Sequence, residues 1–172
     1  MRKDERPGKF FAWTATVSAI VLSAVAAQQA GEHAPDPRRE FVNLMTRVSD
    51  GWTKHDTELA LGAFTDDALY TEPPDLQMYR GAKELRVFFD RITPGATMKW
   101  HHLWYDPVTG FGAGEYSFKN GGRTTAVHGV AVVEIRDGRI ARWREYQRRG
   151  AIDFGEFHDP QDKAWQSTID DL

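Results

Sequence analysis

The chain has 172 residues, of which 41% are hydrophobic and 27% are charged, as in an ordinary globular protein. A formal net charge of -3 and an isoelectric point near 6.1 argue against a nucleic-acid-binding protein, because no overall basic field would attract phosphates. The absence of cysteine excludes disulfides, thiolate metal sites and a cysteine nucleophile.

The N-terminal segment predicts export. Residues 10–27 carry no charge, follow a mostly basic stretch and contain the small-residue pattern Ala24-Val25-Ala26 near their end. We therefore interpret residues 1–27 as a cleaved signal peptide, so that the folded part is periplasmic or secreted. The alternative is an uncleaved membrane anchor, since the run is close to the shortest length that spans a bilayer. Residues 28–38 read as a proline-containing linker.

Helical patterns come first in the folded part. Apolar residues from Phe41 to Trp52 recur at spacings of three and four, with Asp36 as the expected N-cap and Pro37 at the first helical position. The next elements are shorter: helices over residues 58–64 and 82–92, and strands over residues 68–72 and 78–80.

The second half of the chain changes to the alternating pattern of strands. Four long strands are expected over residues 97–105, 112–119, 124–135 and 139–148, separated by turn signals such as Asp137-Gly138. Helices followed by a run of strands predict an α+β fold, in which helices pack on one face of an antiparallel sheet. Residues 153–172 are expected to close one end of this sheet.

Three local strings and the order of the elements resemble the nuclear transport factor 2-like superfamily, in particular its SnoaL-like branch. The strings are Phe64-Thr65-Asp66-Asp67-Ala68-Leu69-Tyr70, Tyr79-Arg80-Gly81 and Asp137-Gly138-Arg139-Ile140-Ala141-Arg142-Trp143-Arg144-Glu145-Tyr146. The resemblance covers residues 39–157. It implies a domain over residues 39–172, with a cone-shaped curved sheet of four long and two short strands wrapped around three helices and an internal pocket. Members include isomerases, epoxide hydrolases, cyclases, dehydratases and proteins without known catalysis, so the fold alone does not define a function.

Glu145 is the strongest candidate for chemistry. It shares a strand face with Trp143, and apolar surroundings would raise its pKa toward the range that suits acid–base catalysis near neutral pH. The alternative is a structural acid that is neutralised by Arg80, Arg123 or an arginine of the C-terminal tail. In the epoxide hydrolase branch of the family an essential acid occupies the matching string, Trp-Arg-Asp-Tyr.

The resemblance also suggests partners for this acid. The epoxide hydrolase branch holds its water with a tyrosine and an asparagine, which match Tyr70 and Glu72. Its arginine and second aspartate fall on Tyr116 and Phe118, so the mechanism of that branch lacks two of its groups here. The steroid isomerase branch uses a carboxylate base, a tyrosine and a protonated acid, which are residue types that this chain also offers. Tyr70 as an ordinary core tyrosine and Glu72 at the solvent rim are the alternatives.

Alternation along residues 97–105 places four side chains on the better pocket wall: Met98, Trp100, His102 and Trp104. His102 would then be a hydrogen-bonding or acid–base group, and the alternative is a histidine at a dimer surface of the sheet. The face of His128 depends on whether the Asp137-Gly138 hairpin has a two-residue loop, which puts it inside, or a three-residue loop, which puts it outside.

The sequence therefore predicts an exported domain that binds a small apolar or aromatic organic molecule and carries out proton transfer of the isomerisation or cyclisation type. The expected catalytic residues are Glu145 as base and Tyr70, Tyr116 or His102 as donors, and the expected substrate contacts are Trp143, Trp100, Phe118 and Glu72. No cofactor, metal or nucleic acid is expected. The alternatives are a non-catalytic ligand-binding or dimerisation module and, more weakly, a hydrolase or dehydratase that uses a water held by Tyr70. The resemblance implies a homodimer through the sheet, with membrane contact only if the N-terminal segment stays uncleaved.

Overall fold

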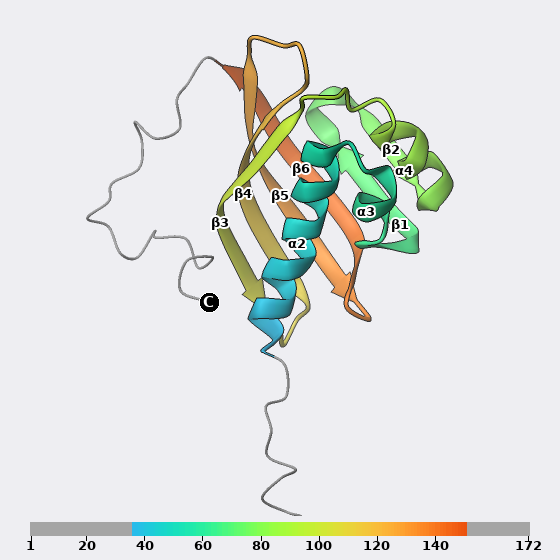
Figure 1. Cartoon of the computed structure of the whole chain (residues 1–172). Coiled ribbons are helices and arrows are strands. Elements are labelled where there is room, and N and C mark those ends of the chain that lie inside the picture. The colour runs from blue at the N-terminus through green and yellow to red at the C-terminus, as the bar shows by residue number, and fades with distance from the viewer. Residues whose placement is uncertain (1–35, 151–172) are drawn as a thin grey trace, which may run out of the picture. The chain divides into compact units, whose positions relative to one another are not determined.

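The computed structural model describes residues 36–150. The predicted signal peptide (residues 1–27), most of the linker and the predicted closing segment (residues 153–172) lie outside this range. The helices are α2 (Pro37–Lys54), α3 (Thr57–Leu61), α4 (Gly81–Phe89) and the short 3-10 helix η1 (Pro73–Asp75). The strands are β1 (Phe64–Glu72), β2 (Gln77–Arg80), β3 (Thr97–Asp106), β4 (Phe111–Lys119), β5 (Ala126–Arg136) and β6 (Arg139–Gly150) (Figure 1).

Helix α2 begins where the sequence predicts. The Asp36 side chain accepts a hydrogen bond from the Arg38 backbone N–H at 3.0 Å, and Pro37 occupies the first turn. The helix ends at His55, whose left-handed φ of 55° stops the helical hydrogen bonding. Its buried face carries the expected apolar residues from Phe41 to Trp52. No helix within residues 36–150 is both long and apolar enough to cross a membrane.

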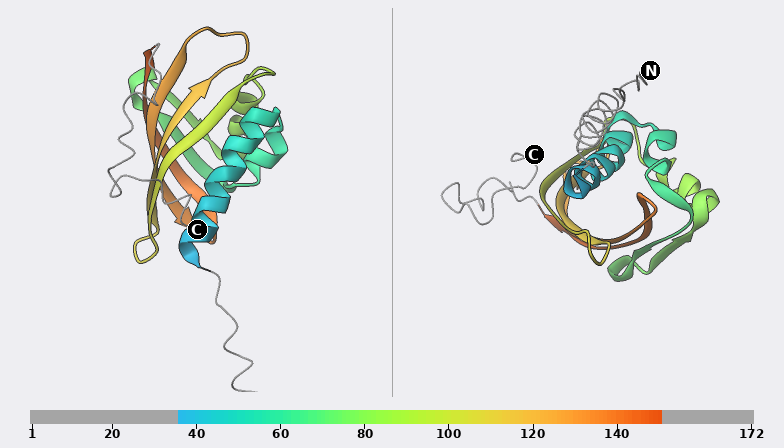
Figure 2. Two further views of the ribbon diagram at one scale, coloured as in Figure 1. Left: turned by 60° about the vertical axis from the view of Figure 1, so that its left-hand side comes forward. Right: turned by 90° about the horizontal axis from the view of Figure 1, so that it is seen from below.

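The six strands form one sheet in the order β2-β1-β6-β5-β4-β3. All neighbours are antiparallel except β1 and β6, which are parallel. An entirely antiparallel sheet was the sequence prediction, and the difference arises because the long connection from β1 to β6 allows a parallel neighbour. Figure 2 shows the sheet bent around the three α-helices, which close its open side, and this arrangement confirms the cone-shaped α+β fold.

Strand β1 is longer than predicted and helix α3 is shorter. The chain leaves the helix at Leu61, and Phe64 already pairs with Ile140 of β6. A register shift between Phe64 and Leu69 then brings Tyr70 beside Trp143. This pairing places the carboxyl end of β1 next to the middle of β6.

Two irregularities in the sheet change which side chains face the interior. In β3 the register shifts between Trp100 and His102, so that Trp100 pairs with Tyr116 and His102 pairs with Glu115. An extra residue in a strand reverses the inward and outward faces beyond it. Leu103, not His102 or Trp104, therefore faces the core, where it is 2% exposed. Met98 and Trp100 therefore keep the predicted inward face, whereas His102 and Trp104 do not.

The second irregularity follows the Asp137-Gly138 hairpin. Arg136 pairs with Arg139, which gives a two-residue loop with positive φ at both positions, 53° and 72°. The register then shifts between Glu134 and Ile135, so that the rest of β6 moves by one residue. His128 consequently lies opposite Arg148 on the outer face, although a two-residue loop alone was expected to turn it inward.

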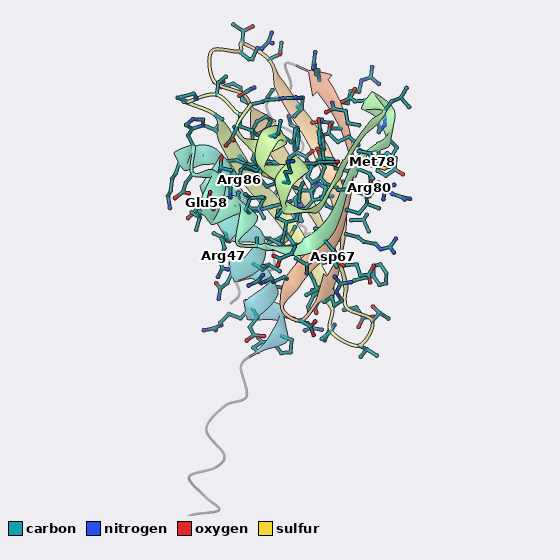
Figure 3. The ribbon with its side chains drawn as sticks, turned by 90° about the vertical axis from the view of Figure 1, so that its right-hand side faces the viewer. Arg47, Glu58, Asp67, Met78, Arg80 and Arg86 are labelled. Atoms are coloured by element: carbon teal, nitrogen blue, oxygen red, sulfur yellow. The ribbon has the colours of Figure 1, made fainter. Side chains whose placement is uncertain are left out.

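Aromatic rings fill the space between the sheet and the helices. Trp143 is 1% exposed and stacks on Tyr70, with ring centroids 5.5 Å apart and ring planes 9° apart. The indole of Trp52 on α2 packs against Phe89 of α4 and Phe118 of β4. On the outside, Arg86 of α4 and Glu58 of α3 form an ion pair that joins these two helices (Figure 3).

Candidate functional site

Two glutamates are buried side by side, Glu72 at the carboxyl end of β1 and Glu145 in the middle of β6. Glu72 and Glu145 are each 3% exposed. The indole N–H of Trp143 donates to Glu145 Oε2 at 2.8 Å, and the amide of Gln147 donates to Glu72 Oε2 at 2.9 Å. No arginine of residues 36–150 forms an ion pair with either carboxyl, so neither is neutralised in the way that the structural alternative requires. The alternative that places Glu72 at the solvent rim is wrong.

Two tyrosines converge on Glu145. Tyr70 from β1 and Tyr116 from β4 are at most 1% exposed, and neither hydroxyl has a hydrogen bond of acceptable geometry within the described chain. Both hydroxyls are nevertheless close enough to Glu145 to stabilise its ionised form. A small movement of either hydroxyl toward Glu145 would complete a hydrogen bond. A bound substrate or a water molecule could also complete the hydrogen bonding of these hydroxyls.

Gly129 of β5 makes room for one of these tyrosines. It pairs with Tyr116 across the strands, and a Cβ atom at Gly129 would lie 2.6 Å from the Tyr116 hydroxyl oxygen. Any side chain at this position would push the phenol away from Glu145. The glycine therefore allows the ring of Tyr116 to lie flat over β5.

The electrostatics of the glutamate pair favour a shared proton. Burial raises the pKa of Glu145, while the hydrogen bond from the Trp143 indole and the nearby hydroxyls of the two tyrosines act against that rise. Burial and then the charge of Glu145 raise the pKa of Glu72 to about 8. Because the donors gather on Glu145, we place the negative charge there and the proton on Glu72 near neutral pH. Burial raises the pKa of Tyr70 and Tyr116 as well, so both phenols stay protonated.

A polar pocket of about 510 Å³ lies at one end of the sheet, next to this group of side chains. Gln147 and Phe118 belong to its lining, and Gln147 connects it to Glu72 through the hydrogen bond described above. The remaining lining residues are Asp75, Asn120, Arg123, Thr125, Val127, Arg148 and Arg149. The side chain of Gln147 therefore stands between the pocket and the buried glutamate pair.

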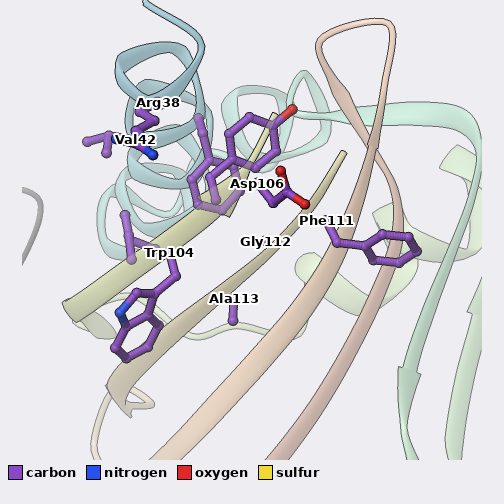
Figure 4. Close-up of a pocket in the computed structure, with 10 residues that line it drawn as sticks. Arg38, Val42, Trp104, Asp106, Phe111, Gly112 and Ala113 are labelled. Carbon is purple, nitrogen blue, oxygen red and sulfur yellow. The ribbon is translucent and has the colours of Figure 1, made fainter. Parts of the chain in front are cut away.

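A larger, mostly apolar groove of about 720 Å³ lies at the opposite end of β4, beside the turn between β3 and β4 (Figure 4). Phe41 and Tyr105 stack there with ring centroids 4.6 Å apart, and Trp104 and Phe111 also line the groove. Its charged lining residues, Arg38 and Asp106, are exposed. The groove is larger than the polar pocket, but it offers no buried acid or base and we do not regard it as the reaction site.

The structure brings most of the predicted site residues together. Glu145, Glu72, Tyr70, Tyr116 and Trp143 form one buried group. Their catalytic and binding roles stay predictions.

The remaining predicted site residues are Trp100, Phe118 and His102. The ring of Trp100 is 5.6 Å from that of Tyr116, and Phe118 lines the pocket. His102 is not part of the group, because the register shift in β3 turns it to the outer face, where its Nδ1 lies 2.5 Å from Glu115 Oε2. Within residues 36–150 no set of three or more acidic or histidine side chains could hold a metal ion.

Gln147 is the site residue that the sequence interpretation did not assign. It follows Trp143 and Glu145 on the same face of β6, so the alternation alone could have drawn attention to it. Its importance depends on the contact with Glu72, which comes from a strand 75 residues away in sequence.

Comparison with known protein families assigns this chain to one of them. The sequence profile of the SnoaL-like domain matches residues 45–143, more than half of the chain, and the protein therefore belongs to the SnoaL-like family. A search of curated protein sequences finds no match.

Solved structures show the same fold at low sequence identity. An epoxide hydrolase of M. tuberculosis that resembles limonene epoxide hydrolase is 21% identical, with a TM-score of 0.55 over 64% of this chain and 84% of that chain. A proposed ketosteroid isomerase of Kribbella flavida is 14% identical, with a TM-score of 0.57 over 74% of this chain and 94% of that chain. A nuclear transport factor 2-like protein of unknown function from Burkholderia xenovorans is 15% identical, with a TM-score of 0.57 over 72% and 96%. These likenesses show the same cone-shaped fold.

Proposed function

We propose that this protein is an acid–base enzyme that moves a proton within a small organic molecule, in a reaction of the isomerisation or cyclisation type. The observation that carries the proposal is the buried pair of Glu72 and Glu145 with two tyrosine hydroxyls beside it. Burying two acids without an arginine partner costs stability, and such an arrangement is commonly kept for chemistry. Proton transfer of this kind needs no cofactor.

The arrangement assigns a role to each group. Glu145, as the carboxylate, removes a proton from a carbon next to a carbonyl group and becomes a carboxylic acid. The negative charge moves to the carbonyl oxygen, which accepts hydrogen bonds from Tyr70 or Tyr116. Glu145 then returns its proton to another carbon of the same molecule, so that charge and protons balance at the end of the cycle. Trp143 holds the carboxyl of Glu145 in place, and protonated Glu72 limits the charge at the site.

Exchange of carbon-bound hydrogen with deuterium in heavy water tests this proposal. We expect the protein to accelerate exchange at the carbon next to the carbonyl of 2-tetralone, an aromatic ketone, and Glu145→Gln to slow that exchange by about a hundredfold. Glu134→Gln is the matched control, because Glu134 lies on the outer face of the neighbouring strand and should leave the rate unchanged.

Ligand capture from the native extract separates catalysis from binding alone. If wild type and Glu145→Gln retain the same unchanged molecule and neither exchanges 2-tetralone, the protein is a binding module and the proposed reaction is wrong.

We further propose that two copies associate through the outer face of the sheet. Four partly exposed apolar side chains occur on this face: Trp104, Val130, Val132 and Tyr146. A dimer would cover them. The protein is expected to sediment as a dimer, and Val132→Glu to give a monomer with an unchanged circular dichroism spectrum. A monomeric wild-type protein at all concentrations would contradict the proposal.

A further inference from the structure

The mouth of the polar pocket is basic. Arg123, Arg148 and Arg149 line it, and Asp75 is the single acidic residue among the described lining residues. None of the three arginines forms an ion pair with another residue of the described chain. Arginines that line one opening and form no ion pair within the described chain favour the entry of a negatively charged molecule.

One of these arginines, Arg149, lies on the same strand face as Glu145. Trp143, Glu145, Gln147 and Arg149 alternate along β6 and so share its inner face. Arg149 pairs with Val127 of β5, and Val127 pairs with Phe118 of β4, which places two apolar side chains beside the arginine. Arg123 comes from the turn between β4 and β5 and lines the same pocket.

The spacing along this row limits the size of a ligand that contacts both ends. Gln147 is in contact with Glu72, and Arg149 lies two residues further on, which is about 7 Å along a strand. That separation is comparable to the length of one or two fused rings. Phe118 and Val127 provide an apolar wall for such rings between the acids and the arginine.

We infer that the substrate is an organic carboxylate whose acid group binds Arg149 and Arg123, while its ring passes Phe118 and its carbonyl end reaches Glu145 and the tyrosines. The inference rests on the proposed proton transfer and names the class of molecule on which it acts. A guanidinium group binds a carboxylate through two parallel N–H donors, which fixes the orientation of the ring as well as its charge. The substrate would enter with its uncharged, carbonyl-bearing end first, and its acid group would stay at the mouth of the pocket.

Two fluorescent probes that differ only in charge test the inference. The acid 6-hydroxy-2-naphthoate and its neutral amide, 6-hydroxy-2-naphthamide, present the same hydroxyl to the glutamate pair and a different group to the arginines. We expect the acid to bind about tenfold more tightly at low salt, and this preference to fall as salt is added. Arg149→Gln should weaken binding of the acid about fivefold, and the double replacement with Arg123→Gln should remove the preference.

Two controls separate this inference from the proposed function. Arg139→Gln, at the other end of β6, should leave both affinities unchanged. Glu145→Gln should weaken both probes alike, because both place a hydroxyl donor at the carboxylate. If acid and amide bind equally, or if the arginine variants keep the preference, the inference of a carboxylate substrate is overturned while the proposed proton transfer stands. If Glu145→Gln leaves both affinities unchanged, the proposed site itself is wrong.

Discussion

Trp143→Ala is expected to lower the free energy of unfolding by about 4 kcal/mol, the usual cost of emptying a large buried aromatic site. The indole is 1% exposed and packs against Tyr70, Phe64 and Trp100, with centroid distances between 5.5 and 6.0 Å. Its removal would also leave Glu145 without its only indole donor. Chemical denaturation followed by circular dichroism measures the loss.

Two further variants separate packing from hydrogen bonding at this position. Trp143→Phe keeps most of the ring volume but loses the N–H donor, and about 2 kcal/mol is the expected cost. Phe111→Ala is the control, since Phe111 is 51% exposed and should cost less than 1 kcal/mol, a change typical of about ±0.5 kcal/mol at surface positions. Equal losses for Trp143→Ala and Phe111→Ala would show that Trp143 is not at the centre of the core.

Replacing both Glu72 and Glu145 by glutamine is expected to stabilise the protein at high pH. A carboxyl whose pKa is raised by folding contributes most below its ordinary value of 4.5, and that contribution is lost as the pH rises through the raised value, here about 8 for Glu72. The wild type should therefore lose stability between pH 4.5 and about 8, whereas the glutamine variant should lack this slope. Above that range the variant should be more stable by about 3 kcal/mol, after a reduction of the full shift for solvent screening and relaxation.

Thermal unfolding across this pH range measures the difference, with Glu134→Gln as the control for loss of a surface carboxyl. A constant difference between wild type and the glutamine variant at all pH values would mean that neither glutamate has a raised pKa. The sign of this difference in stability is informative, because glutamates that stabilised the fold in their ionised form would make the glutamine variant less stable than the wild type at high pH. Stability given up at such a pair is the expected consequence of keeping a base in an apolar interior.

The sequence could predict those features of the site that depend on residues close together in the chain, but not those that depend on distant strands. The alternation of Trp143 and Glu145 along β6 is a local pattern, and it correctly predicted that the acid is buried beside an indole. The burial of Glu72 was not predictable in this way, because it follows from the parallel pairing of β1 with β6, more than 70 residues apart in sequence. A residue before two prolines is read as a solvent-exposed end unless that partner is known.

The two register shifts explain the wrong assignments of faces. Strict alternation assumes that no strand contains an extra residue, and the shifts near His101 and in the hairpin of β5 and β6 each reverse the faces beyond them. His102 moved outward for the first reason and His128 for the second. Neither irregularity has a glycine or proline at the shift itself that would have revealed it in the sequence.

The site also departs from the epoxide hydrolase branch that the sequence resembles. Tyr116 and Phe118 stand where that branch is expected to have an arginine and an aspartate, and here they supply a phenol beside Glu145 and an apolar wall of the pocket. The second acid instead comes from Glu72 on β1. A carboxyl pair with tyrosine donors suits proton transfer to and from carbon better than the activation of a water by an ion-paired acid.

The central claim is that Glu72 and Glu145 share one proton near neutral pH, and carbon-13 NMR of the two side-chain carboxyls tests it most directly. Signals assigned through Glu72→Gln and Glu145→Gln are expected to show one protonated and one ionised carboxyl, with the last proton lost near pH 8. Removing Glu145 should lower the pKa of Glu72 toward its ordinary value, whereas removing Glu72, whose hydrogen bond favours the ionised form of Glu145, should raise the pKa of Glu145. If both carboxyls instead lose their protons near 4.5 and each ignores the replacement of its neighbour, the pair does not share a proton and the proposed base is not tuned for catalysis.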